Sequence, residues 1–304
     1  LRAFGELQDF DSIPLLIKCF DSDKIAIRER AVDVLLSYDE LTCNDEYSLI
    51  SNYELVKAAE KLYKSESKEE IRSKVVILIS KISTVTAIDF LLRVLKESHG
   101  KLKADTIYAL GNYNDPKISI FIKPYLSVKD ADQRVAAAIS LYKFDDYMEE
   151  SNYVISSFLH SKKEKDIAFG LFALGELELK NRKKVCFSYL NSKNIEIKIQ
   201  SAISLAKMGD ERVIPTLLDL IFKEGDEVKQ RVKKLLQNIN VRISKNLDKI
   251  IKHIAEEEIK KTIEENENKS LQELDRGTLV NLRWLYCLVD EYEEFENINY
   301  ILKN

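Results

Sequence analysis

Few side chains in this sequence are placed to carry chemistry. The only histidines, His99, His160 and His253, have no histidine, cysteine or paired carboxylates at the spacing that a metal site needs. The chain also lacks G-x-x-x-x-G-K-[ST], G-x-G-x-x-G, G-x-S-x-G and H-E-x-x-H motifs, which argues against a nucleotide site or a metalloprotease. We therefore expect exposed histidines, no catalytic residues, no metal and no cofactor.

The cysteines also lack the spacing of a reactive or metal-binding site. No two of them form a C-x-x-C pair, and they are scattered along the chain at Cys19, Cys43, Cys186 and Cys287. We expect buried free thiols in a reducing compartment, which points to the cytoplasm or to the cytoplasmic face of a membrane protein.

The most regular charged feature is a column of six cations, each seven residues before an apolar residue that closes a helical segment: Arg28, Arg72, Lys103, Arg134, Lys198 and Lys229. On successive helices about 10 Å apart, such a ladder could bind an acidic peptide or a phosphate backbone. Alternatively, each cation pairs with an acidic residue of the preceding turn and ties neighbouring repeats together. Examples are Asp21 or Asp23 before Arg28, Asp130 before Arg134, and Asp226 before Lys229. Acidic residues outnumber basic ones by 51 to 47, so we favour the structural interpretation.

A cluster of aromatic residues near the end of the chain is the second candidate. Its members are Trp284, Tyr286, Tyr292 and Phe295, with Tyr300 close behind. Such clusters usually belong to a core. In a terminal element, part of the cluster can instead form a docking patch for a partner.

The helices that position these residues follow from an internal repeat. An apolar anchor recurs at intervals of 31 residues, with one interval of 44 and one of 33, at Phe4, Leu35, Ile79, Leu110, Leu141, Leu174, Leu205 and Leu236. Five residues after an anchor an acidic residue recurs, at Asp9, Glu40, Asp115, Asp146 and Asp210. These carboxylates can cap the next helix, and Pro14 and Pro215 fall near helix starts, where a missing amide costs little.

Each repeat contains two amphipathic helical segments, with apolar residues at spacings of three and four. Neither helix can bury its apolar stripe alone, so stacked pairs must share one continuous core. The sequence predicts an all-α fold, an α-solenoid of about seven helix pairs.

The stretches LKADTIYALGNYNDPKISIFI and EIKIQSAISLAKMGDERVIPTLL resemble the short HEAT-like repeats first described in phycobilisome lyases. The resemblance covers residues 1 to about 239 and implies a right-handed superhelix of helix pairs. It implies no particular activity, because this repeat serves unrelated functions.

Two segments depart from the repeat. The 44-residue interval holds extra residues within 38–55, which lengthen either a loop or a helix. After residue 239 the period is lost, and we expect a helical C-terminal extension over 240–304. The chain opens within a second helix, which suggests a piece of a longer protein.

Composition agrees with a helical, water-exposed chain. Its 304 residues include only 8 Gly and 4 Pro, and 45% are hydrophobic and 32% charged. A net charge of -4 does not favour nucleic acid, and no apolar run is long enough to span a membrane.

We therefore expect a non-enzymatic scaffold or regulatory module that binds a protein or peptide along the concave row of second helices. The iron-dependent deoxyhypusine hydroxylases with this repeat carry His-Glu pairs, which this sequence lacks. One alternative is a cytosolic HEAT domain of a membrane protein similar to nucleotide transporters. The other is a nucleic-acid-binding array.

Overall fold

The chain folds entirely into helices wherever its structure is described. The computed structural model describes residues 10–38, 46–236, 239, 241–267, 269–289 and 291–303, and within them every regular element is an α-helix or a short 3-10 helix. The all-α prediction is therefore confirmed. The chain divides into two compact units, Leu1–Leu177 and Glu178–Asn304. The domain boundary expected near residue 239 stays a prediction.

In the described residues of unit 1 the helices form five pairs. The first helices of the pairs are α2 (Ile13–Cys19), α4 (Glu46–Ser65), α6 (Val85–Glu97), α8 (Pro116–Ile122) and α10 (Asp145–Leu159). The second helices are α3 (Ile25–Leu36), α5 (Glu69–Ser80), α7 (Gly100–Gly111), α9 (Ala131–Leu141) and α11 (Glu164–Glu176). Two 3-10 turns extend the first helices, η1 (Phe10–Ser12) before α2 and η2 (Lys123–Ser127) after α8.

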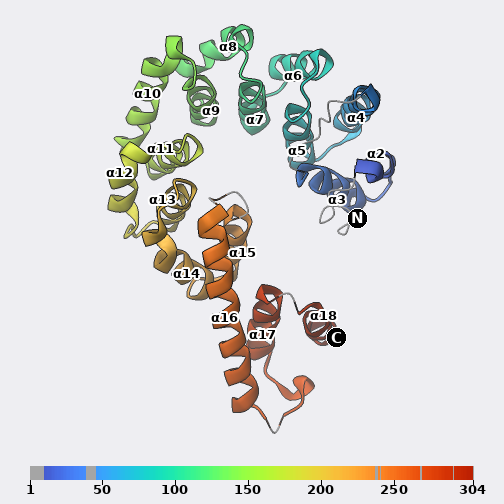
Figure 1. The fold of residues 1–304 in the computed structure, drawn as a ribbon, viewed down its shortest axis with the longest axis vertical. Coiled ribbons are helices and arrows are strands. Elements are labelled where there is room, and N and C mark those ends of the chain that lie inside the picture. The colour runs from blue at the N-terminus through green and yellow to red at the C-terminus, as the bar shows by residue number, and fades with distance from the viewer. Residues whose placement is uncertain are drawn as a thin grey trace. The chain divides into compact units, whose positions relative to one another are not determined.

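The helices of unit 1 lie in two rows. Each second helix contacts the second helix of the next pair, so that α3, α5, α7, α9 and α11 form an inner row. The first helices, from α4 to α10, form the outer row (Figure 1). Because every pair packs mainly on its neighbours, the core of unit 1 is a continuous layer between the two rows.

The apolar anchors of the repeat lie at the centre of this layer. Five of them are at most 1% exposed in unit 1, at Leu35, Ile79, Leu110, Leu141 and Leu174. In unit 2, Leu205 is fully buried and Leu236 is half-buried, whereas Phe4 lies outside the described residues. Burial at this spacing accounts for the period of the sequence.

Acidic residues of the repeat cap helices as the sequence predicts. The carboxylate of Asp115 accepts a hydrogen bond from the amide of Lys117 at 2.8 Å, and Asp210 accepts one from the amide of Arg212 at 3.3 Å. Asp146 instead lies inside the first turn of α10. Capping satisfies amides that have no partner within their own helix.

Two further start signals are also found where expected. Pro14 and Pro215 are the second residues of α2 and α14. An amide in the first turn has no acceptor within its own helix, so proline loses no hydrogen bond there. The acidic positions Asp9 and Glu40 lie outside the described residues.

The long interval of the repeat contains a long helix. α4 has 20 residues, whereas α2 and α8 have 7 each. Residues 39–45 lie outside the described part. At least part of the additional sequence therefore extends a first helix.

Unit 2 continues with two helix pairs and then a different arrangement. The pairs are η3 (Lys180–Arg182) and α12 (Lys183–Tyr189) with α13 (Ile195–Lys207), then η4 (Glu211–Val213) and α14 (Ile214–Phe222) with α15 (Asp226–Leu235). They are followed by α16 (Val241–Glu265), η6 (Leu271–Glu273), α17 (Arg276–Leu288) and α18 (Tyr292–Lys303).

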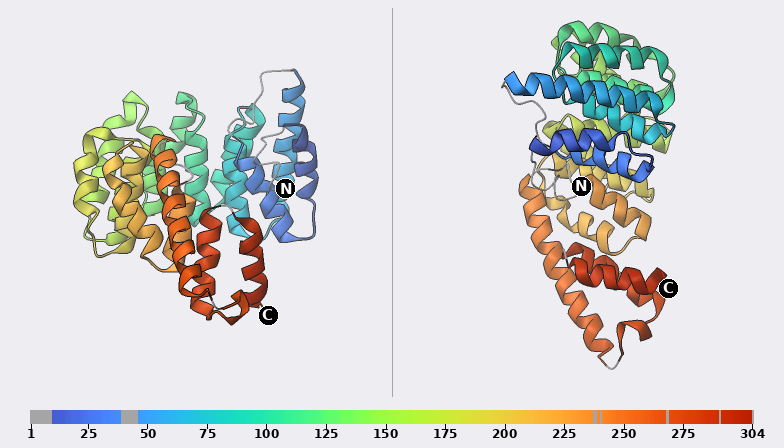
Figure 2. Two further views of the ribbon diagram at one scale, coloured as in Figure 1. Left: turned by 60° about the horizontal axis from the view of Figure 1, so that its bottom comes forward. Right: turned by 90° about the vertical axis from the view of Figure 1, so that its right-hand side faces the viewer.

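The last three helices of unit 2 pack on one another. The 25-residue α16 runs beside α17, and α17 packs on α18 (Figure 2). The side chains that hold α17 in place are four buried leucines, Leu279, Leu282, Leu285 and Leu288. Ile298 of α18 is fully buried in the same unit.

Candidate binding surface

The six predicted cations occupy one equivalent position, the fourth residue of a second helix. Their helices are α3, α5, α7, α9, α13 and α15, and α11 has Ile167 in that place. All six side chains are half-buried. At Arg28 and Arg134 the position faces the turn between the two helices of the pair, whose backbone carbonyls lie within hydrogen-bonding distance.

Arg28 makes the most extensive contacts of the column. Its guanidinium donates to the backbone oxygens of Ser22 at 2.8 Å and Asp23 at 3.2 Å. It also forms an ion pair with Glu66, at 2.8 Å between Nη2 and Oε2. Glu66 follows α4, the first helix of the next pair, so the contact joins neighbouring pairs.

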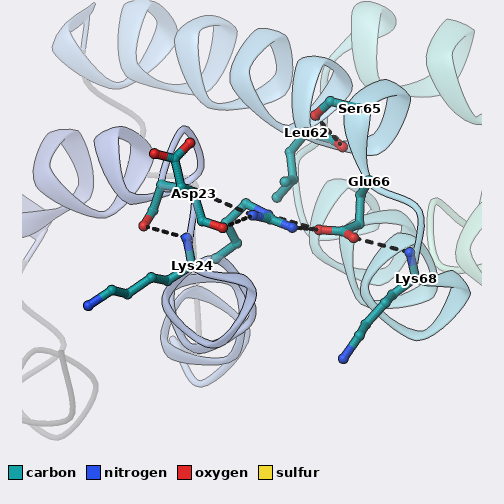
Figure 3. A network of polar contacts seen from close by, with 8 residues as sticks. Asp23, Lys24, Leu62, Ser65, Glu66 and Lys68 are labelled. Atoms are coloured by element: carbon teal, nitrogen blue, oxygen red, sulfur yellow. Dashed lines mark hydrogen bonds and ion pairs between the residues drawn. The ribbon is translucent and has the colours of Figure 1, made fainter.

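Glu66 is the buried end of this contact. Its side chain is 0% exposed and accepts a hydrogen bond from the Lys68 amide at 3.1 Å (Figure 3). Burial alone would raise the pKa of Glu66, but the hydrogen bonds from Lys68 and Arg28 outweigh it and hold the pKa below its ordinary value. The carboxylate therefore stays ionised.

Arg134 repeats the geometry of Arg28 three pairs further along the chain. It donates to the backbone oxygens of Val128 at 3.1 Å and Lys129 at 3.5 Å, which lie six and five residues before it. In place of an ion pair, its guanidinium lies 5.0 Å from the ring centroid of Phe158, near the end of α10. A cation over an aromatic face joins two pairs much as an ion pair does.

Three other cations of the column lie near a side chain of a first helix or of the segment that follows it. Arg72 lies 5.8 Å from the ring centroid of Tyr63, and Lys103 lies 5.9 Å from that of Tyr125. In unit 2, the Nζ atom of Lys198 lies 3.7 Å from a carboxylate oxygen of Glu224. Lys229 is half-buried in α15.

These partners differ from the acidic residues expected in the preceding turn. Asp23 offers Arg28 its backbone oxygen and not its carboxylate, and Asp21 pairs with Lys61 of α4 at 2.8 Å. The carboxylate of Asp130 accepts from the amide of Gln133 and caps α9. Backbone carbonyls of the preceding turn accept hydrogen bonds from the cation. The charged or aromatic partner of the cation often comes from the next pair. The side chain of Asp226 lies outside the description.

A second set of contacts between pairs has only a weak sequence signal. Lys81 donates to the backbone oxygens of Leu36 at 2.6 Å and Tyr38 at 2.8 Å, and Lys143 donates to that of Gly111. Each lysine stands two residues after an anchor and caps the second helix of the preceding pair. The recurrence of Lys at this position could have indicated the contact, which satisfies carbonyls at a helix end.

The inner row carries a stripe of side chains at one repeat position, two residues before each anchor. In unit 1 they are Asp33, Ile77, Tyr108, Ile139 and Phe172. Ile77 is 37% exposed, although it belongs to the row of core-forming helices. Beside it, Lys74 pairs at 2.7 Å with both Glu29 and Asp33 of α3. An exposed apolar residue beside a group of charged side chains matches the apolar centre and polar rim of a protein-binding surface.

The predicted aromatic patch is only partly exposed. Trp284, Tyr286 and Phe295 are half-buried, and burial raises the pKa of Tyr286. Tyr292 is 41% exposed and Tyr300 72%. The patch therefore has a half-buried part, mostly on α17, and an exposed part on α18.

Two grooves lie within single units. In unit 1 a groove of about 320 Å³ separates α4 from α6, and its lining includes Tyr53, Lys57, Asp89 and the Glu60–Arg93 ion pair at 2.9 Å. In unit 2 a groove of about 240 Å³ is lined by residues of α14, α16 and α17. The groove of unit 1 is lined mainly by polar and charged side chains, whereas the groove of unit 2 is more apolar and lies below the range of about 300–1,000 Å³ that is typical of small-molecule pockets.

The histidines and cysteines differ in their exposure. His99, His160 and His253 are exposed, as the sequence predicts. Cys186 is buried and Cys19 is half-buried, both with free thiols, whereas Cys43 lies outside the described residues.

The described ranges contain no group of three or more His, Cys, Asp or Glu side chains that could hold a metal ion. Within those same ranges, no helix combines the length and apolar character needed to cross a membrane.

Comparison with known proteins gives a likeness of fold. No family model and no curated protein matches the chain. Chains of solved structures do match. One is human deoxyhypusine hydroxylase in complex with glycerol, which covers 95% of this chain and 99% of its own at a TM-score of 0.45 and 10% identity. Another is an engineered protein, which covers 95% of this chain and 82% of its own at a TM-score of 0.30 and 14% identity.

The first of these matches corrects the expectation of a non-enzymatic scaffold. The aligned protein is an enzyme, and the alignment covers 95% of this chain. The expectation of a non-enzymatic scaffold is therefore contradicted. At 10% identity the likeness concerns the fold and assigns no hydroxylase activity to this chain.

Proposed function

We propose that the helix pairs form a HEAT-like α-solenoid and that the inner row of unit 1 binds an extended segment of a partner protein. The observation that carries the proposal is the exposure of Ile77 on α5 of the inner row, one helical turn after Lys74 and its ion pairs with α3. The 31-residue period and the buried anchors support the HEAT-like assignment. The scattered cysteines support a location in the cytoplasm or on the cytoplasmic face of a membrane protein.

The surface around Ile77 suits an apolar side chain held by polar neighbours. Tyr108 stands at the equivalent position on α7, which packs directly on α5. Helices in contact are about 10 Å apart, so a partner residue between them can touch both side chains. Lys74, Glu29 and Asp33 form a charged rim on the side of α3. Such a rim excludes water from a central contact and fixes the orientation of the bound segment.

A displayed library of peptides from the source proteome tests this surface. Peptides selected on the whole chain are measured against Ile77→Asp and against Ile120→Asp, a matched change on the outer helix α8, where Ile120 is 65% exposed. Burying a charge in the contact should lower affinity by about tenfold or more for Ile77→Asp. Ile120→Asp should bind as the parent does.

Two results of the peptide selection would contradict the proposal. One is selection of peptides that tolerate Ile77→Asp, and the other is selection of peptides whose affinity falls only with Ile120→Asp. Retention of DNA or RNA in place of peptides, with a steep dependence on salt, would also overturn it.

A further inference from the structure

A hydrogen bond joins two helices of unit 1 that are not neighbours in the inner row. The phenolic hydroxyl of Tyr108 on α7 donates to Oε2 of Glu176, the last residue of α11, at 2.8 Å. The two residues are 68 positions apart in the chain. Both α7 and α11 pack on α9, which lies between them in the row (Figure 1).

This contact requires the inner row to bend at α9. Axes of packed helices are about 8–10 Å apart, so in a flat row α7 and α11 would be separated by roughly 16–20 Å. A tyrosine and a glutamate side chain cannot comfortably reach across that distance. Unit 1 therefore curves enough to bring the inner sides of α7 and α11 together.

The inner side of α9 is correspondingly covered. Ile139 of α9 and Ile77 of α5 stand at the same repeat position, yet Ile139 is 6% exposed and Ile77 is 37% exposed. Ala136, one turn before Ile139, is also 6% exposed. The stripe that is open at α5 is closed at α9, where α7 and α11 are joined.

The Tyr108 hydroxyl remains a hydrogen-bond donor at physiological pH. Burial, and then the negative charge of Glu176, raise the pKa of Tyr108 well above its ordinary value. The phenol therefore keeps its proton over the whole physiological range. The bond is lost by separation of the two helices and not by titration of the tyrosine.

We propose that Tyr108 and Glu176 form a strap that closes the inner side of α9 and that opens when a partner segment binds there. In the closed state Ala136 and Ile139 are inaccessible, and in the open state they extend the apolar stripe from Ile77 and Tyr108. The inference rests on the proposed function, since it describes how access to part of that binding surface is controlled. A repeated fold permits such opening because each pair contacts mainly its neighbours.

Thiol labelling at position 139 measures the opening directly. Ile139→Cys is introduced into the full chain after its four native cysteines are replaced by serine or alanine, and its reaction with N-ethylmaleimide is timed without any partner. Loss of one partly buried hydrogen bond should raise the open population, and with it the labelling rate, about fivefold. We expect this increase in Tyr108→Phe and in Glu176→Ala.

Two matched variants separate a strap from a general loss of stability. Tyr113→Phe also removes a half-buried phenolic hydroxyl, but that hydroxyl donates to the backbone oxygens of Ile79 and Ile82, between neighbouring pairs. Glu176→Gln keeps an oxygen that can accept from Tyr108. Both should label within about twofold of the parent, because neither removes the bond between α7 and α11.

Equal labelling of the parent and Tyr108→Phe would overturn the strap, as would an equal acceleration in Tyr113→Phe. The assay contains no peptide, so its result does not depend on whether the inner row binds one. Failure of the peptide selection with accelerated labelling would leave the strap and remove its proposed occupant.

Discussion

Gly111 of α7 lies directly against Ser140 of α9. A Cβ atom on Gly111 would fall 2.2 Å from the hydroxyl oxygen of Ser140 and 3.0 Å from its Cα atom. The two helices of the inner row therefore approach as closely as the absence of a side chain allows. At this position the residue after the anchor is glycine because a side chain there would collide with Ser140.

Gly111→Ala should accordingly destabilise unit 1. Separating α7 from α9 should cost about 1–3 kcal/mol, because overpacking forces a shift of the backbone. Urea unfolding followed by circular dichroism measures the loss. In the double variant Gly111→Ala with Ser140→Gly, the loss should be smaller than the sum of the two single losses. Strictly additive losses would mean that the two residues do not meet.

The buried anchors test the register of the repeat. Leu110→Ala and Leu205→Ala should each cost about 2–5 kcal/mol, since each leaves a cavity in a packed layer. Both leucines are at most 1% exposed. Replacing an exposed apolar residue of the outer row, Val85→Ala at 74% exposure, is the control and should change stability by less than about 0.5 kcal/mol. Equal effects at all three positions would refute the register.

The two ion pairs that join α4 to the preceding pair should differ in strength. Arg28→Met leaves the fully buried carboxylate of Glu66 without its cation and should cost about 3 kcal/mol at neutral pH. Lys61→Met breaks the contact with Asp21, whose two side chains are 68% and 65% exposed, and should cost less than about 1 kcal/mol. Chemical denaturation of both variants measures the two losses in the free energy of unfolding. A loss for Arg28→Met no larger than that for Lys61→Met would show that Glu66 finds another partner.

The carboxylate of Asp210 should make the stability of unit 2 depend on pH. The carboxylate is bound by Arg212 at 2.7 Å and Lys183 at 3.1 Å, and mainly the hydrogen bond from Arg212 holds its pKa well below the ordinary value of 3.8. A depressed folded pKa stabilises the fold above the unfolded pKa, and the contribution is lost as pH falls through the folded pKa. Asp210→Asn should therefore be less stable than the parent at pH 7 by about 1–3 kcal/mol.

Fluorescence of Trp284, the only tryptophan, reports unfolding of unit 2. The difference between Asp210→Asn and the parent should shrink as the pH is lowered below 3.8. A difference that stays constant from pH 7 to pH 3 would mean that the ion pairs of Asp210 contribute nothing to stability.

The elements of this protein follow from local sequence. Anchors such as Leu110 and Leu141 are buried at the predicted spacing, and helices begin at the expected acidic caps and prolines. These features depend on the periodicity of apolar residues and on which side chain can accept from the next few amides. Both are properties of residues close together in the chain, so one sequence suffices to read them.

The contacts of the candidate surface required the three-dimensional arrangement. The position of Arg28 in its helix is predictable, but its pairing with Glu66, 38 residues later, depends on where the next pair places its first helix. The bond between Tyr108 and Glu176 has no sequence signal, because it depends on the curvature of the inner row. Curvature is the sum of small rotations between successive pairs, and each rotation is set by packing such as that of Gly111 on Ser140. The sequence by itself determined the helices and their buried faces, and the tertiary structure decided which side chains of different helix pairs meet.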